Sequence, residues 1–381
     1  MPPRRNIVYF VIFTLLFWTI GPLMVYIVDP YHIFHETRWN KNLWFGSQTL
    51  INLGQIETYL KRSNDYDGIL VGSSHTMNFK GSDLAKAVGA KGVLKLCGGN
   101  QHVESSCNWV KYAMTTGKVK YVIIGFNFLL PPETEAFRGK KVSFFYQMIL
   151  SLAILKDQVK LNLHRSNINN TYQNWSDPDS IYNWFLRKKR DFDCWSSNRR
   201  ALMPYIANTA EFGAYQIKDP ISAVLSTPII KDINRLLILI RDNAAVKFYL
   251  MIPPNSWLQY DYVQWEFRKV APSRRYDAFF NGWRHLITAC ADLPNVKIYG
   301  WHDCAFVSNL ANYRDPSHYH PDINRYMAWC IEHDKHRLTK ENYDAYEARC
   351  VENLRAFKIL DSYPHRDTFE ELVAAEMQDG N

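Results

Sequence analysis

Short apolar runs that alternate with amphipathic stretches constrain the fold of this chain more than any other feature. Five runs have the composition of buried strands: 67–72, 92–96, 120–126, 245–252 and 295–299. Helix-like segments fall between or after them: 102–116, 229–242, 276–291 and 321–333. In the second of these, an apolar face is formed by Ile230, Ile233, Leu236, Leu237 and Ile240. The alternation predicts an α/β fold in three layers, with a central parallel sheet between helices.

Composition limits the classes of protein to consider. The chain has 381 residues, of which 47% are hydrophobic and 15% aromatic, more ring surface than a disordered chain carries. The net charge of +8 comes from 45 basic and 37 acidic residues without long basic runs. A nucleic-acid partner is therefore not expected.

The N-terminus contains the longest uncharged segment. Ile7 to Val28 carries no charge, follows Arg4 and Arg5, and precedes Asp29. A helix over these residues spans about 33 Å, enough to cross a bilayer. We expect a cytoplasmic segment at 1–6 and a transmembrane anchor at 7–28. A cleaved signal peptide or a buried helix of a soluble protein are the alternatives.

The rest of the chain is predicted to form one domain outside the cytoplasm. This domain covers 29–335 and contains a polar and aromatic insertion at 131–221. The charged segment 336–381 is predicted to be a helical tail on the surface. The seven cysteines are scattered, without C-x-x-C or zinc-ligand spacing, so no metal or cofactor is expected.

A serine motif directly follows the first predicted strand. The sequence Gly72-Ser73-Ser74-His75-Thr76 places small residues where a strand turns into a helix. Such a turn exposes a hydroxyl at the carboxyl edge of the sheet and brings backbone N–H groups to it, as a serine nucleophile requires. A tight turn with a capping serine is the alternative.

An Asp-x-x-His motif occurs near the other end of the predicted sheet. Asp315 and His318 lie three residues apart after the last predicted strand. A carboxylate at this spacing can fix the imidazole tautomer, and the second ring nitrogen then accepts a serine proton. A second copy, Asp29 to His32, lies outside the strand pattern and is discounted.

Together, the two motifs resemble the SGNH/GDSL-like hydrolase superfamily, in its membrane-anchored cell-envelope branch. The resemblance implies a flavodoxin-like SGNH fold in which Ser74 is the nucleophile, His318 the base and Asp315 the orienting acid. It also implies that Gly99 and Asn127 contribute to the oxyanion hole, although Gly-x-Asn-Asp is replaced by Gly-Phe-Asn-Phe at 125–128. A simple turn role for Asn127 is the alternative.

By this resemblance we expect a serine esterase or O-acyltransferase at the bacterial inner membrane, with its main domain periplasmic or extracellular. Its substrate would be a cell-surface polysaccharide or a lipid-linked glycan, and a multi-pass membrane O-acyltransferase would be a partner. No metal or cofactor is required. A non-catalytic envelope module with a degenerate fold is the first alternative.

A glycosyltransferase is the second alternative. Three Asp-x-Asp pairs could each hold a metal-bound nucleotide-sugar: Asp65-x-Asp67, Asp177-x-Asp179 and Asp191-x-Asp193. His333 and His336 could share a helix face, but a solvated face is favoured. The aromatic cluster Trp257 to Trp265 is expected to serve packing rather than sugar binding.

Overall fold

The structure is a computed structural model of the chain. It describes residues 3–28, 56, 60, 64–98, 101–128, 179, 227–257, 273–314, 317–357 and 365–379. Asp315, Gly99 and the insertion 131–221 except Asp179 lie outside these residues.

A single sheet of six strands forms the centre of the described domain, in the order β2-β1-β3-β4-β5-β6. The first five strands are parallel: β1 (Gly68–Gly72), β2 (Val93–Cys97), β3 (Tyr121–Gly125), β4 (Lys247–Ile252) and β5 (Val296–Gly300). Their side chains are almost all buried, as in a sheet covered on both faces. All five predicted strands are present with small shifts in their bounds, so the α/β prediction is confirmed.

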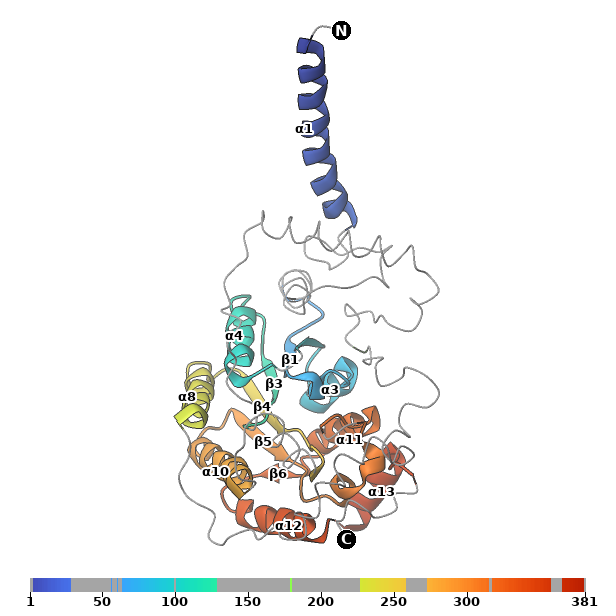
Figure 1. The fold of residues 1–381 in the computed structure, drawn as a ribbon. Coiled ribbons are helices and arrows are strands. Elements are labelled where there is room, and N and C mark those ends of the chain that lie inside the picture. Colours follow the sequence, from blue (N-terminus) through green and yellow to red (C-terminus); the bar gives the residue numbers. More distant parts are fainter. Residues whose placement is uncertain are drawn as a thin grey trace.

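Helices cover both faces of the sheet and give three layers (Figure 1). One layer contains α4 (Val103–Met114), α8 (Thr227–Arg241) and α10 (Ser273–Cys290). The other contains α3 (Gly81–Val88), α11 (Pro321–Glu332) and α13 (Phe369–Asp379). In α8, Ile229 is buried while Ile230 is exposed, which corrects the predicted apolar face by one residue at its start.

The segment after residue 335, where the sequence predicts a helical tail on the surface, adds one strand and two helices to the described domain. Strand β6 (Arg337–Leu338) pairs antiparallel with β5. Helix α12 (Tyr343–Ala356) buries Tyr343 and Tyr346, and the Tyr343 hydroxyl donates a hydrogen bond to the Phe280 carbonyl at 2.8 Å. Aromatic burial on one side of α12 outweighs the charged character of the segment as a whole.

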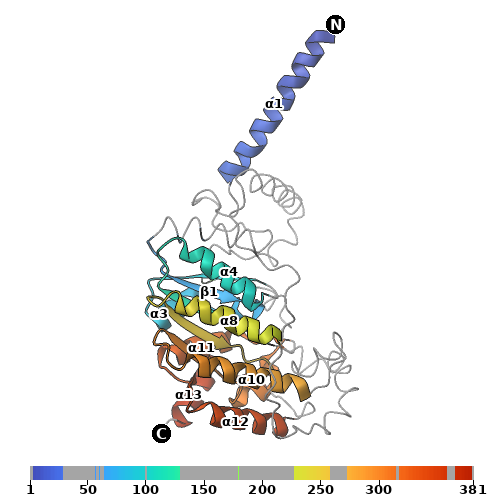
Figure 2. The ribbon, with the colours of Figure 1, turned by 90° about the vertical axis from the view of Figure 1, so that its left-hand side faces the viewer.

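The N-terminal helix α1 (Pro3–Val28) points away from the three layers (Figure 2). Its described apolar side chains are mostly exposed, including Phe10 and Phe13 at 72% and 71%. By the combined measure of length and apolarity, none of the helices in the described ranges can cross a membrane. The predicted transmembrane anchor at 7–28 is therefore unsupported.

Candidate active site

Ser74 lies at the carboxyl edge of the sheet, where β1 gives way to a short 3-10 helix, η2 (Ser74–Thr76). Ser73 is extended at φ −80° and ψ −171° and precedes this helix. The turn is closed by Thr76, whose N–H and hydroxyl both donate to the Ser73 carbonyl, at 3.0 and 2.7 Å. Ser74 is partly exposed whereas Ser73 and His75 are buried, so the turn presents the Ser74 hydroxyl at the surface.

Two glycines let this turn lie directly against the sheet. Gly72 and Gly125 are register partners on β1 and β3, and both lie close to Thr76. A Cβ on Gly125 would be 2.3 Å from Thr76 Cγ2, and a Cβ on Gly72 would be 2.5 Å from the Gly125 carbonyl oxygen. Neither position can hold a side chain without a shift of the turn.

His318 comes from a narrow loop between η7 (Leu310–Asn312) and α11. The loop is held by a bridge between Tyr313 and Tyr319 and by a hydrogen bond from Arg314 N–H to the His318 carbonyl at 2.9 Å. His318 Nε2 lies 2.7 Å from Ser74 Oγ, although the two residues are 244 positions apart in the chain. The structure therefore brings the predicted serine and histidine into hydrogen-bond contact.

The contact allows the hydrogen-bond direction that a nucleophile and its base require. When His318 Nε2 is unprotonated, the Ser74 hydroxyl donates to it, and the ring proton is then on Nδ1. Ser317 Oγ lies 3.4 Å from that Nδ1 and can accept its proton. The predicted orienting acid, Asp315, falls outside the described ranges, so its place beside Nδ1 stays a prediction.

Stacked aromatic rings pack against the His318 imidazole. The His75 ring stacks on it with a centroid distance of 5.3 Å and an interplanar angle of 22°. Tyr319 continues the stack at 6.4 Å from His75. His75 is fixed in turn by Ser73, whose Oγ is 2.6 Å from His75 Nδ1. Sequence reasoning gave His75 no role, because its contact with His318 exists only in the folded chain.

Burial raises the pKa of the Tyr319 hydroxyl. This side chain therefore stays neutral at physiological pH, and it adds no charge that would attract or repel the imidazolium formed when His318 accepts a proton.

Asn127 follows β3 at the same edge of the sheet as Ser74. Gly72 on β1 is aligned with Gly125 on β3, and Ser74 and Asn127 each come two residues after one of these aligned positions. Asn127 is buried, with 7% of its surface exposed. Gly99, the other predicted oxyanion group, lies outside the described residues, so its position stays a prediction.

The other candidate residues from the sequence have contacts of their own. Asp67 precedes β1, at the opposite edge of the sheet, and its carboxylate accepts a hydrogen bond from the Lys91 N–H at 2.8 Å. Asp179 accepts one from the Ser82 N–H at 2.7 Å, and Asp177 with the third pair falls outside the described residues. Trp257 is fully buried, in agreement with packing. No Asp-x-Asp pair joins Ser74 within the described ranges.

Comparison with protein-family models, with curated proteins and with solved structures finds no match for this chain.

Proposed function

We propose that this protein is a serine esterase or O-acyltransferase with Ser74 as nucleophile and His318 as general base. The observation that carries the proposal is the 2.7 Å contact between Ser74 Oγ and His318 Nε2 at the carboxyl edge of a parallel sheet. Ligands of such sheets bind beyond this edge. The partial exposure of both side chains leaves the pair accessible to a substrate.

The geometry supports an acyl-enzyme mechanism. Ser74 Oγ attacks the carbonyl carbon of an ester while His318 Nε2 takes the hydroxyl proton, and a tetrahedral oxyanion forms. His318 then gives the proton to the departing alcohol, and the acyl group stays on Ser74. Water or a sugar hydroxyl attacks this ester in the second half, again with His318 as base. Asn127 stabilises the oxyanion as an amide donor, an effect worth about 3 kcal/mol for one donor in other enzymes.

The ring stack explains how His318 keeps its position through both halves. Proton transfer requires Nε2 to stay within hydrogen-bond distance of Ser74 and then of the leaving oxygen. His75 restricts rotation of the His318 ring, and the closed loop between Tyr313 and Tyr319 restricts its backbone. His75 is therefore a positioning residue in this proposal.

The setting of the reaction is part of the proposal and rests on the sequence. The uncharged segment Ile7 to Val28 after Arg4 and Arg5, with its exposed apolar side chains, favours attachment of α1 to the inner membrane and a domain outside the cytoplasm. The substrate there would be a surface polysaccharide or lipid-linked glycan. A multi-pass membrane O-acyltransferase would deliver the acyl group.

Labelling of the full-length protein with a fluorophosphonate tests the nucleophile. The wild type should label on Ser74, as identified by mass spectrometry of the modified peptide. Ser74→Ala should abolish labelling, and His318→Gln should slow it by about 10²–10⁴-fold through loss of the general base. Ser82→Ala, at an exposed position of α3, is the matched control and should label at the wild-type rate.

Asn127→Ala should lower turnover of acetyl esters by about 10²–10³-fold. A wild type that resists the reagent and has no esterase or transferase activity would instead support the non-catalytic module. Equal labelling of Ser74→Ala would exclude Ser74 as nucleophile.

A further inference from the structure

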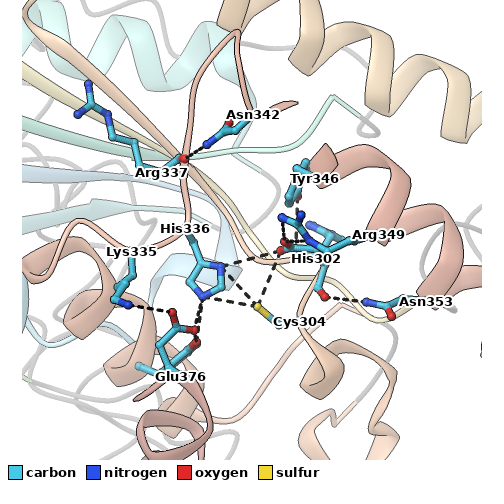
Figure 3. Close-up of polar contacts among 12 residues, drawn as sticks. His302, Cys304, Lys335, His336, Arg337, Asn342, Tyr346, Arg349, Asn353 and Glu376 are labelled. Atoms are coloured by element: carbon cyan, nitrogen blue, oxygen red, sulfur yellow. Dashed lines mark hydrogen bonds and ion pairs between the residues drawn. The ribbon is translucent and has the colours of Figure 1, made fainter. Parts of the chain in front are cut away.

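A second cluster of reactive side chains lies where β5 ends and β6 begins (Figure 3). Asp303 and Cys304 follow β5, and His336 directly precedes β6. Cys304 Sγ is 3.8 Å from His336 Nδ1 and 3.9 Å from Asp303 Oδ1, and the last two atoms are 3.9 Å apart. One sulfur, one nitrogen and one oxygen thus lie within 3.9 Å of one another, a set of donors able to hold a metal ion.

The three atoms form a nearly equilateral triangle of the right size for a transition metal. With sides of about 3.9 Å, the centre is about 2.2 Å (3.9/√3) from each corner, and protein zinc sites have bonds of about 2.3 Å to sulfur and 2.0–2.2 Å to nitrogen and oxygen. Thiolate, imidazole and carboxylate together suit the borderline-soft Zn²⁺, whereas Mg²⁺ and Ca²⁺ take oxygen ligands.

Outer contacts orient two of the three proposed ligands. His336 Nε2 lies 2.7 Å from Glu376 Oε2 (Figure 3). It also lies 3.1 Å from the Tyr326 hydroxyl. A proton on Nε2 can be donated to Glu376, which leaves Nδ1 unprotonated and able to bind a metal ion. A carboxylate behind a ligating histidine is the usual outer shell of a zinc site.

Asp303 is held in the same way. Its Oδ2 accepts hydrogen bonds from Arg349 Nε and Nη2 at 3.1 and 2.8 Å, so Oδ1 remains directed at the cluster. The side chains of Asp303 and His336 are 8% and 15% exposed. The two side chains are therefore largely screened from solvent.

The backbone at this point adopts a conformation that favours glycine. Asp334 and His336 have φ values of 53° and 57°, and they are the non-glycine residues with positive φ in the described ranges. Because α11 ends at Glu332, His333 and His336 do not share a helix face: His333 stacks on Trp329 at 4.3 Å instead. The left-handed residues turn the chain so that the His336 ring reaches Cys304.

We propose that Asp303, Cys304 and His336 bind one Zn²⁺ ion, which ties the end of β5 to the start of β6. Through the contact of His336 with Glu376, the ion also fixes α13. Binding replaces the thiol proton of Cys304, which is released to solvent. The site lies three strands from β1 along the same sheet edge, about 14 Å at 4.8 Å per strand. No step at Ser74 passes through it, so its role is structural.

Metal titration of the full-length chain tests the proposal. After treatment with a chelator, the protein should take up one Zn²⁺ per chain in competition with a metallochromic dye. Co²⁺ in its place should give a thiolate-to-metal charge-transfer band, which requires a cysteine ligand. Saturating Zn²⁺ should raise the melting temperature by about 5 °C.

Variants separate a ligand role from a fold defect. Cys304→Ser should remove the Co²⁺ band and the Zn²⁺-dependent melting shift, and Glu376→Gln should weaken binding about tenfold or more. Cys290→Ser, in α10, and His333→Gln are matched controls that should retain both readouts. A wild type without the Co²⁺ band, or a Cys304→Ser variant that keeps it, would overturn the proposal. Ser74 labelling is independent of either result.

Discussion

The contact between Gly125 and Thr76 offers a quantitative test of how the fold holds the candidate nucleophile. In Gly125→Ala the new Cβ would lie 2.3 Å from Thr76 Cγ2, and ordinary contact begins at 3.4 Å. Thr76 must therefore move by about 1.1 Å (3.4 − 2.3) unless the strand moves instead. Ser74 belongs to the same short helix, so its 2.7 Å contact with His318 should lengthen beyond hydrogen-bond range.

Gly125→Ala should change both the unfolding free energy and the labelling rate. Overpacking a core position costs about 1–3 kcal/mol of unfolding free energy. A displacement of about 1 Å at reacting groups costs about 10²-fold in rate. Urea unfolding measures the first quantity, and the rate of fluorophosphonate labelling at Ser74 measures the second.

A second substitution makes the test specific. Thr76→Ser removes Cγ2 but keeps the hydroxyl, which donates to the Ser73 carbonyl at 2.7 Å and lies 3.1 Å from Cys97 Sγ. Alone it should cost about 1 kcal/mol for one buried methyl group. In the double variant the Cβ introduced by Gly125→Ala would next meet Met251 Cε at 3.4 Å, an ordinary contact.

The double variant should therefore recover most of the labelling rate and lose less stability than the sum of the single variants. Purely additive effects on both quantities would refute the reasoning that Gly125 is required by the Ser74 turn.

The other two predictions concern pH and location. Burial lowers the pKa of His302 to about 3, so the unfolded chain binds a proton below pH 6.5 that the folded chain does not. Its contribution to stability is present above pH 6.5 and is lost as the pH falls towards 3. Between pH 7 and 5, wild type should lose about 2 kcal/mol more unfolding free energy than His302→Gln; equal losses would contradict this. Full-length protein should sediment with membranes, whereas deletion of 1–28 should free it. An intact chain that stays in the membrane-free fraction would contradict attachment through α1.

Local patterns in the sequence were sufficient to predict most strands of the sheet and the serine–histidine pair. Five buried strands are visible as apolar runs because each is covered on both faces, so its composition is fixed by its own position. Ser74 and His318 could be paired because the carboxyl ends of parallel strands meet at one edge. The 2.7 Å contact between Ser74 Oγ and His318 Nε2 confirms that the two segments meet.

Elements that depend on distant partners could not be predicted. Strand β6 has two residues and no recognisable period, and it exists because β5 offers free backbone groups beside it. Helix α3 has buried Leu84, Ala85 and Val88 at helical spacing, but with only eight residues it is shorter than the window of about 11–18 residues over which helical periodicity is read. The position of α12 in the core depends on partners such as Phe280.

The sequence alone determined the α/β class and the two catalytic candidates, because strand and helix periodicity and the Ser and Asp-x-x-His motifs are local properties of the chain. Only the tertiary structure decided the ring stack of His75 on His318 and the cluster of Cys304 with His336. These two cluster residues are 32 positions apart without a zinc-ligand spacing between them. Contacts between distant segments depend on chain geometry, which no short motif records.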